Sequence, residues 1–298
     1  MDPILVQLGP LAIRWYGFLI ALGVLFGAMW ALRLAERRGL DPDKLLDMAL
    51  WLVIAGVIGA RLVYVVTSPT AFFGPNGNLL DVVKIWQGGI SIHGGVAGVV
   101  VAMWLYARRH GLDMWAYMDV LTPLGALGIV GGRIGNIMNG TDTGGRLTDL
   151  GIGFAWPEPG TPFLGAVGRV VFGDPLWLYA PPACRAVPMG EPCVVHFTQA
   201  YGVLVGVILL GIVLWSLSRL RPSGHAFWTF VLWYSVLRSV LEEPFRDNPL
   251  SWQVYLNESA GIGLFTLTQL ASVVLVLIAA YMLLTLPEPV TRRERAKA

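Results

Sequence analysis

Charge is scarce in this chain. Asp, Glu, Lys and Arg make up 13% of the 298 residues, and hydrophobic residues make up 55%. The mean hydropathy is +0.64. Because a soluble globular domain carries about 25% charged residues, this composition excludes that class and predicts a protein that crosses a lipid bilayer several times.

Three other features are absent, and each absence argues against one property: a cleaved signal peptide, a transporter built from inverted repeats, or a metal site. No basic n-region precedes the first apolar run, where Asp2 stands instead, so we expect the first helix to be retained rather than cleaved as a signal peptide. No internal repeat is visible, unlike the inverted repeats of many transporters. No His, Asp and Glu cluster has the spacing of metal ligands, and we expect no metal, no cofactor and no nucleic-acid partner.

Seven apolar segments are long enough for membrane-spanning helices, since one span needs roughly 20 mostly apolar residues. They are residues 11–32, 47–66, 88–107, 115–136, 199–217, 225–243 and 262–286. The expected fold class is therefore an all-α polytopic membrane protein with seven transmembrane helices.

The 21 Lys and Arg residues predict the orientation. If the N-terminus lies outside, twelve of them fall in cytoplasmic stretches, five in outer loops and four within the spans. This excess of basic residues inside predicts an outer N-terminus and a cytoplasmic C-terminus.

One connection, residues 140–197, is the only long one outside the spans. It is rich in Gly and Pro and holds both cysteines, Cys184 and Cys193. A loop of this length is usually a small head domain or a functional lid, and on the outer side a disulfide and two free thiols both stay open. The expected domains are residues 1–139 with four helices, the head 140–197, and residues 198–298 with three helices and a basic tail.

Polar residues inside the spans indicate a candidate site, because the predicted topology brings them to one layer in the outer half of the membrane. They are Arg14, Arg61, His93, Arg133, Asn136, Asn139, Tyr234, Arg238 and Glu242. Guanidiniums are costly inside a membrane, and Glu242 and Glu243 are the only nearby acids in the spans. The excess of guanidiniums favours a bound phosphate, which their planar fork can grip with two hydrogen bonds.

Single residues of this layer also have less specific explanations. Arg14 can extend to the lipid headgroups, and His93 can form an interhelical hydrogen bond without any role in catalysis. Glu242 can be the counter-charge of Arg238 or Arg61.

Residues 131–140 read GGRIGNIMNG, a run that closely resembles the signature of the bacterial prolipoprotein diacylglyceryl transferase family. Three further stretches share the resemblance: Arg14-Trp15-Tyr16-Gly17, residues 90–95 (ISIHGG), and Tyr234 with Arg238, Glu242 and Arg246. The similarity covers nearly the whole chain, including the seven spans and the outer head, which it places in the periplasm together with the N-terminus.

The resemblance implies an enzyme of the bacterial cytoplasmic (inner) membrane. Such an enzyme takes phosphatidylglycerol from the outer leaflet, transfers its diacylglyceryl group to the lipobox cysteine of a preprolipoprotein, and releases glycerol phosphate. The resemblance also implies that Arg133 and Arg238 serve headgroup binding and activity, and that Arg246 borders the periplasmic opening. The other implied site residues are His93, Asn136, Tyr16 and Gly144 or Gly145.

The implied reaction requires the thiol, with a pKa of about 8.5, to lose its proton. His93 is the only intramembrane group whose ordinary pKa suits a general base. A strong positive potential that lowers the thiol pKa is the alternative. Arginines aimed at the leaving phosphate would stabilise the charge that develops there.

Three positions depart from the family pattern. Thr141 and then Asp142 follow the Asn-Gly of the signature, where the family has an acid at once. Residues 196–202 (HFTQAYG) are similar to the family's His-Pro-Ser-Gln-Leu-Tyr-Glu but end on Gly202. Pro244 is expected to break the sixth helix, and Arg246 stands one position away from its place in the family pattern.

Two other function classes would also collect arginines in one layer. An organic-anion transporter needs a polar path to the cytoplasmic side, and the inner halves of these spans hold few polar residues. A diverged, non-catalytic lipid-binding paralogue would have no use for a titratable His93. We therefore expect a transferase whose partners are phosphatidylglycerol, the lipobox segment and the bilayer.

Overall fold

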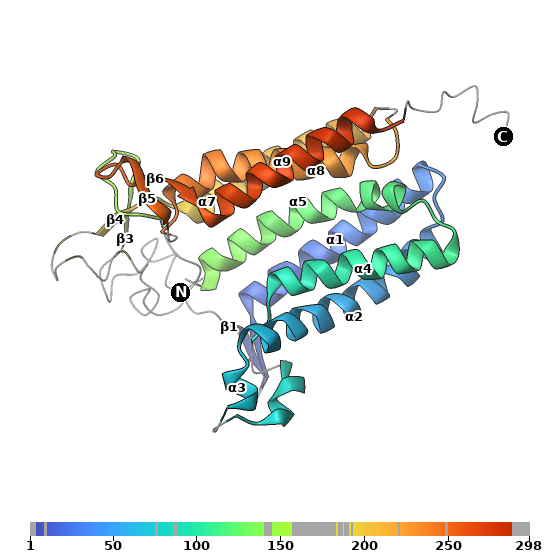
Figure 1. Ribbon diagram of the computed structural model, residues 1–298, viewed down its shortest axis with the longest axis horizontal. Helices are drawn as coiled ribbons and strands as arrows, with labels where there is room; N and C mark the ends of the chain where they lie inside the picture. Colours follow the sequence, from blue (N-terminus) through green and yellow to red (C-terminus); the bar gives the residue numbers. More distant parts are fainter. Residues whose placement is uncertain are drawn as a thin grey trace. The chain divides into compact units, whose positions relative to one another are not determined.

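The computed structural model consists of two compact units, each described by itself (Figure 1). Unit one comprises Met1–Ala31 and Leu121–Ala298, and unit two comprises Leu32–Val120. The structure describes residues 4–8, 11–74, 77–85, 89–139, 145–156, 183, 187, 191, 193–219, 221–247 and 250–287.

Long helices occupy all seven predicted segments. They are α1 (Trp15–Arg37), α2 (Pro42–Thr67), α4 (Ile92–His110), α5 (Met114–Asn139), α7 (Thr198–Leu217), α8 (His225–Leu237) and α9 (Leu267–Thr285). Within the described residues, five of them, α1, α2, α5, α7 and α9, are long and apolar enough to cross a membrane. The prediction of a helical membrane protein is therefore confirmed. The count of seven spans stays a prediction, because α4 and α8 do not meet that criterion.

Several predicted helix ends were wrong. Leu11–Arg14 forms strand β2 and Ile262–Thr266 forms strand β6, so the first and last helices begin at Trp15 and Leu267. Hydropathy cannot separate a short apolar strand from the start of an apolar helix. The third helix begins at Ile92 instead of residue 88, after Gly89 with a φ of 76°.

Unit two is built on the close packing of α2 against α4. A Cβ on Gly59 would lie 2.3 Å from the Gly94 carbonyl oxygen, and one on Gly98 would lie 2.2 Å from the carbonyl oxygen of Ala55. Only glycine allows such an approach of two backbones, as is common between membrane helices. The short helices α3 (Thr70–Phe73) and η1 (Leu79–Val83) connect the pair.

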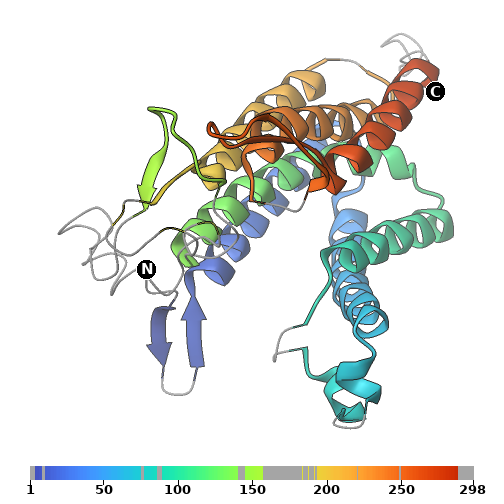
Figure 2. The same cartoon turned by 60° about the vertical axis from the view of Figure 1, so that its left-hand side comes forward.

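Unit one places α7, α8 and α9 side by side, and its other long helices are α5 from Leu121 onward and α1 up to Ala31 (Figures 1 and 2). The described residues of this unit also form three antiparallel strand pairs. The pairs are β1 (Ile4–Leu8) with β2, β3 (Phe154–Trp156) with β4 (Cys193–Val195), and β5 (Leu250–Asn257) with β6. The all-α prediction was thus wrong in detail, because it allowed for no strands beside the helices.

The described part of the predicted head is joined to the β5–β6 hairpin. Thr148 Oγ1 donates to the Ala260 carbonyl over 2.9 Å, and the backbone N–H of Asp149 donates to the Ser259 carbonyl over 3.0 Å. Cys193 is disulfide-bonded, whereas Cys184 lies outside the described residues. The β5–β6 hairpin, which lies far along the sequence, therefore packs on the described part of the region predicted as a head domain.

His196 links this head to the hairpin. It is fully buried, and its Nε2 lies 2.7 Å from the Ala260 carbonyl oxygen. Since a carbonyl only accepts, Nε2 carries the proton, and in the neutral ring Nδ1 accepts from the hydroxyl of Tyr201 at 3.2 Å. Burial lowers the pKa of His196 below its ordinary value of 6.5.

The stability of unit one should therefore depend on pH through His196. The unfolded chain takes up a proton on His196 below its ordinary pKa, while the folded chain resists it. The free energy of unfolding that neutral His196 contributes is therefore complete above about pH 6.5. It is lost as the pH falls through the pKa of His196 in the folded protein. In the His196→Gln variant, whose amide can also donate to Ala260, the thermal unfolding midpoint should fall less between about pH 7.5 and 5.5. Equal pH dependence of the two proteins would contradict this assignment.

Candidate active site

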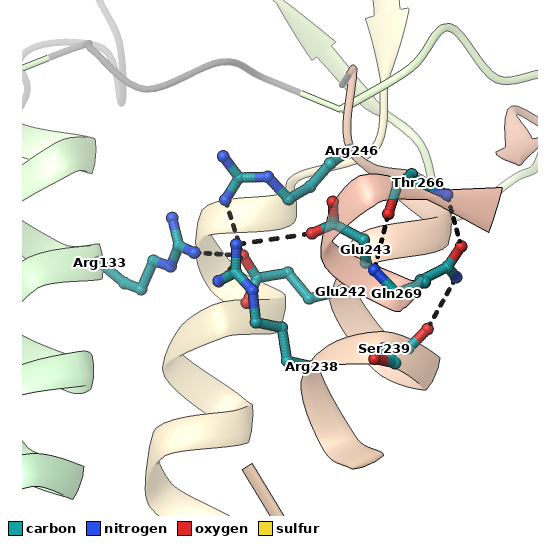
Figure 3. Close-up of polar contacts among 8 residues, drawn as sticks. All are labelled: Arg133, Arg238, Ser239, Glu242, Glu243, Arg246, Thr266 and Gln269. Carbon is teal, nitrogen blue, oxygen red and sulfur yellow. Dashed lines mark hydrogen bonds and ion pairs between the residues drawn. The ribbon is translucent and has the colours of Figure 1, made fainter. Parts of the chain in front are cut away.

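Three arginines of unit one converge on the carboxylate of Glu242, the last residue of the π-helical turn η5 (Arg238–Glu242) (Figure 3). Arg133 of α5 donates to its Oε1, and so does Arg246 Nη1 over 2.8 Å. Arg238 Nη1 lies 3.5 Å from the same oxygen, and its Nη2 lies 3.5 Å from Oε2 of Glu243. One carboxylate oxygen thus holds guanidiniums from separate segments together.

The accessible part of this arginine–glutamate cluster is cationic. The five side chains together carry a formal charge of +1, with three guanidiniums facing two carboxylates. The carboxyl side chains are 1% and 0% exposed for Glu242 and Glu243, whereas Arg133 and Arg238 are 12% and 18% exposed. An anion that approaches the cluster therefore meets guanidinium groups, while the carboxylates lie behind them.

Pro244 explains why the helix is irregular at the cluster. Proline has no N–H, and its ring clashes with the carbonyl of the residue four positions earlier, here Val240, so an α-helix cannot continue. Helix α8 ends at Leu237, and the chain passes through η5 into the 3₁₀ turn η6 (Glu243–Phe245). The predicted break at Pro244 is confirmed. The helix predicted for residues 225–243 is shorter, and Arg238 and Glu242 lie on a π-helical turn, where the two side chains meet.

Gly202 of α7 leaves the space that the Arg133 side chain occupies. A Cβ on Gly202 would lie 2.6 Å from Nε, 2.8 Å from Cδ and 2.9 Å from Cγ of Arg133. Distances below about 3 Å are too short for real Cβ contacts. Gly202 therefore lies directly against the Arg133 side chain, and a larger residue at this position would require Arg133 to shift.

Other predicted residues surround the cluster. Tyr234 interacts with Arg238 and stacks on Phe230 with ring centroids 6.0 Å apart. Arg246 is buried and pairs through its backbone with Gly145, at the start of the described head. Asn136 lies on α5, three residues after Arg133, and is half-buried.

Arg61 lies in unit two, where its partners are backbone carbonyls. Its Nε donates to Val82 over 2.8 Å, its Nη1 to Gly89 over 2.6 Å, and its Nη2 to Asp81. The guanidinium also lies 5.2 Å from the ring centroid of Phe72. Arg61 therefore holds together the segment between α2 and α4.

The remaining predicted residues are placed by their backbone alone. His93 is the second residue of α4 in unit two, Arg14 ends β2, Tyr16 is the second residue of α1, and Asn139 ends α5. Their side chains, and all of Gly144, lie outside the described parts of the structure. Their roles in the site stay predictions. In the described ranges, no group of three His, Cys, Asp or Glu side chains could hold a metal ion.

The sequence matches the family model described as prolipoprotein diacylglyceryl transferase over residues 3–285. The chain belongs to this family. It is similar to the phosphatidylglycerol–prolipoprotein diacylglyceryl transferase of Thermus thermophilus, with 49% identity over 279 residues that cover 94% of this chain and 96% of the relative. The relative of the same name from Deinococcus radiodurans is 45% identical over 292 residues, which cover 95% and 85%. The predicted family is confirmed, and the chain is a transferase.

Glu243, a member of the cluster, and Gly202, which lies beside it, were not predicted as site residues. Glu243 was recognised only as a nearby acid, and Gly202 only as a departure from the family pattern. The doubled acid Glu242-Glu243 before Pro244 is a signal that could have indicated a second counter-charge. The contact of Gly202 with Arg133 has no such signal, because it joins two helices that are distant in sequence.

Adding one methyl group at Gly202 should displace Arg133 and impair the transferase. We expect Gly202→Ala to lower turnover by roughly tenfold or more, since small misplacements of catalytic groups can cost this much. Gly211→Ala is the matched control, because it lies on the same helix and a Cβ there meets nothing within 4 Å. Similar turnover of both variants in the same lipid would contradict the role of Gly202.

Substitutions of Glu242 should separate charge from hydrogen bonding. Glu242→Gln keeps an acceptor and should reduce transferase activity only in part, whereas Glu242→Ala should approach the loss seen with Arg238→Ala. Removing one partner of a buried pair costs about 3–5 kcal/mol. The variant that combines Arg238→Ala and Glu242→Ala should be little less active than either single variant, because the effects of substitutions at contacting residues are not additive. Additive losses, with exposed Glu258→Ala as an unaffected control, would show that Glu242 acts apart from Arg238.

Proposed function

We propose that this protein transfers the diacylglyceryl group of phosphatidylglycerol to the cysteine thiol in the lipobox of a preprolipoprotein. The products are a thioether-linked lipid on the acceptor and glycerol phosphate. The names of the relatives at 49% and 45% identity provide both substrates. The arginine–glutamate cluster provides a physical reason for the choice of lipid.

The observation that carries the proposal is the partly exposed cationic face formed by Arg133 and Arg238. The phosphodiester of phosphatidylglycerol carries one negative charge, which balances the formal charge of +1 on the five side chains. Two guanidiniums can grip its free oxygens with pairs of parallel hydrogen bonds. A zwitterionic headgroup would instead bring an ammonium group close to three arginines.

The same geometry suits the chemistry of transfer. The thiolate sulfur attacks the glycerol carbon that bears the phosphate ester, a carbon–sulfur bond forms, and the carbon–oxygen bond to the phosphate breaks. The electron pair of the broken bond goes to the leaving glycerol phosphate, so negative charge grows on its oxygens. Guanidiniums already held in place by Glu242 and Glu243 stabilise that charge without reorganising.

The thiol proton needs an acceptor, and we assign that role to His93. The imidazole has an ordinary pKa of about 6.5, which suits a base near neutral pH. Asn136 and Tyr234 are assigned to the lipid headgroup beside the arginines. Tyr16, Arg14, Asn139 and Gly144 are proposed to line the remainder of the substrate site.

The proposed location is the cytoplasmic membrane of a bacterium. Seven spans, including α4 and α8, with the N-terminus outside and the C-terminus inside would put the outer ends of α5 and α8 at the periplasmic surface. Both ends carry members of the arginine–glutamate cluster. Lipid from the outer leaflet and a translocated lipobox segment could then reach the cluster from the same side.

Purified protein with phosphatidylglycerol and a lipobox peptide should form a thioether-linked diacylglyceryl peptide. Mass spectrometry of the peptide and release of glycerol phosphate measure the two products. Phosphatidylethanolamine should support little transfer, and Arg133→Lys should lose most activity, because an ammonium cannot reproduce a two-bond guanidinium contact. Equal use of both lipids would contradict the charge argument, and absence of product with every anionic lipid would contradict the function.

A further inference from the structure

Gln269 connects helix α9 to the turn that carries Arg238 and Glu242 (Figure 3). Its Nε2 donates to the carbonyl of Ser239, inside η5, over 3.1 Å. Its Oε1 accepts from the backbone N–H of Thr266 over 3.0 Å, and its own N–H donates to Thr266 Oγ1 over 3.2 Å. One side chain thus both caps the start of α9 and reaches across to η5.

The Ser239 carbonyl needs this contact because the local backbone cannot supply a donor. In an α-helix the N–H of residue 243 would reach it, but in η5 the N–H of Glu243 bonds to the carbonyl of Arg238. In a continued π-helix the next donor would be residue 244, which is proline and has no N–H. The irregular turn and Pro244 together leave the Ser239 carbonyl dependent on a side chain.

The surroundings of the Ser239 carbonyl strengthen its dependence on Gln269. Ser239 and Gln269 line a groove of about 410 Å³ whose walls are mostly apolar, with Leu264, Val273 and Leu277 among them. A backbone carbonyl without a donor is unfavourable beside apolar walls, because those side chains offer it no replacement hydrogen bond. If Gln269 cannot donate, we expect the turn to rearrange until the carbonyl finds another partner.

We propose that Gln269 is a positioning residue for the transferase site. By bonding Ser239 it holds η5 in the π-helical form that directs Arg238 and Glu242 toward each other and toward Arg133. Gln269 itself does not touch the substrate in this proposal. Its role in catalysis rests on the proposed function, whereas its control of the shape of η5 does not.

Two substitutions separate this role from ordinary stabilisation of α9. Gln269→Met keeps the length and bulk of the side chain but removes the donor to Ser239. Thr266→Val keeps the shape of the cap residue and removes the hydroxyl that accepts from the Gln269 N–H, while the bond from Nε2 to Ser239 can persist. Both variants weaken the helix cap, and only the first should release η5.

Hydrogen–deuterium exchange of the ligand-free protein tests the structural part. Amides of residues 238–246 should exchange faster in Gln269→Met than in the wild type, and at the wild-type rate in Thr266→Val. Unchanged exchange in Gln269→Met, or an equal increase in both variants, would overturn the proposal. This readout needs no substrate, so it stands apart from any failure of the proposed reaction.

Turnover tests the consequence for the site. Gln269→Met should lower kcat by roughly tenfold to a hundredfold, as expected for displaced catalytic groups, with a smaller change in KM for phosphatidylglycerol. Thr266→Val should stay near the wild-type kcat. In the Arg238→Ala background, Gln269→Met should cause a further loss of less than about twofold, because coupled residues are not additive. A full additional loss in that background, or equal losses in Gln269→Met and Thr266→Val, would overturn the positioning role.

Discussion

The sharing of the Glu242 carboxylate among three arginines is the interaction on which the site depends. Arg133 comes from α5, Arg238 from η5, and Arg246 from the segment after η6. Buried guanidiniums repel one another and are costly to remove from water unless a carboxylate lies between them. Glu242 therefore fixes where α5 and the end of α8 must meet. Glu243 adds a second negative charge, and together they leave the exposed side of the cluster cationic.

This arrangement requires an irregular helix. Regular α-helical hydrogen bonding ends at Leu237, and the π-helical turn that follows it and precedes Pro244 allows both Glu242 and Glu243 to be buried beside arginines. The irregular turn leaves the Ser239 carbonyl without a backbone donor, and Gln269 on helix α9 donates to it instead. Irregular turns of this kind are often found at functional sites. Here the reason is visible, because the same turn carries a proposed phosphate-binding arginine and its counter-charge.

Gly202 connects the family pattern to the electrostatics of the cluster. A glutamate at this position, which the resemblance implies for other members, would add a third carboxylate near three guanidiniums, and its Cβ would require Arg133 to shift. With glycine, Arg133 lies against α7 and reaches Glu242, and the five cluster side chains keep a positive formal charge. Gly145, the β5–β6 hairpin and Arg246 extend the same network, since Gly145 pairs with Arg246 and His196 with Ala260.

The membrane class, the seven helical segments and the family could be predicted from the sequence alone, because hydropathy and the GGRIGNIMNG run are local properties of the chain. The sequence also indicated Arg133, Arg238 and Glu242 as candidate site residues, since charge inside an apolar span is costly and therefore conspicuous, and the structure brings the three side chains together. Helix ends at Trp15 and Leu267 were missed, because apolar strands and apolar helices have similar composition. The folded structure was needed to see which carboxylate pairs with which arginine, that Arg61 bonds to backbone carbonyls, and that Gly202 and Gln269 contact the cluster and its turn. Those contacts join segments far apart in sequence, and their specificity comes from distances between side chains that no local pattern encodes.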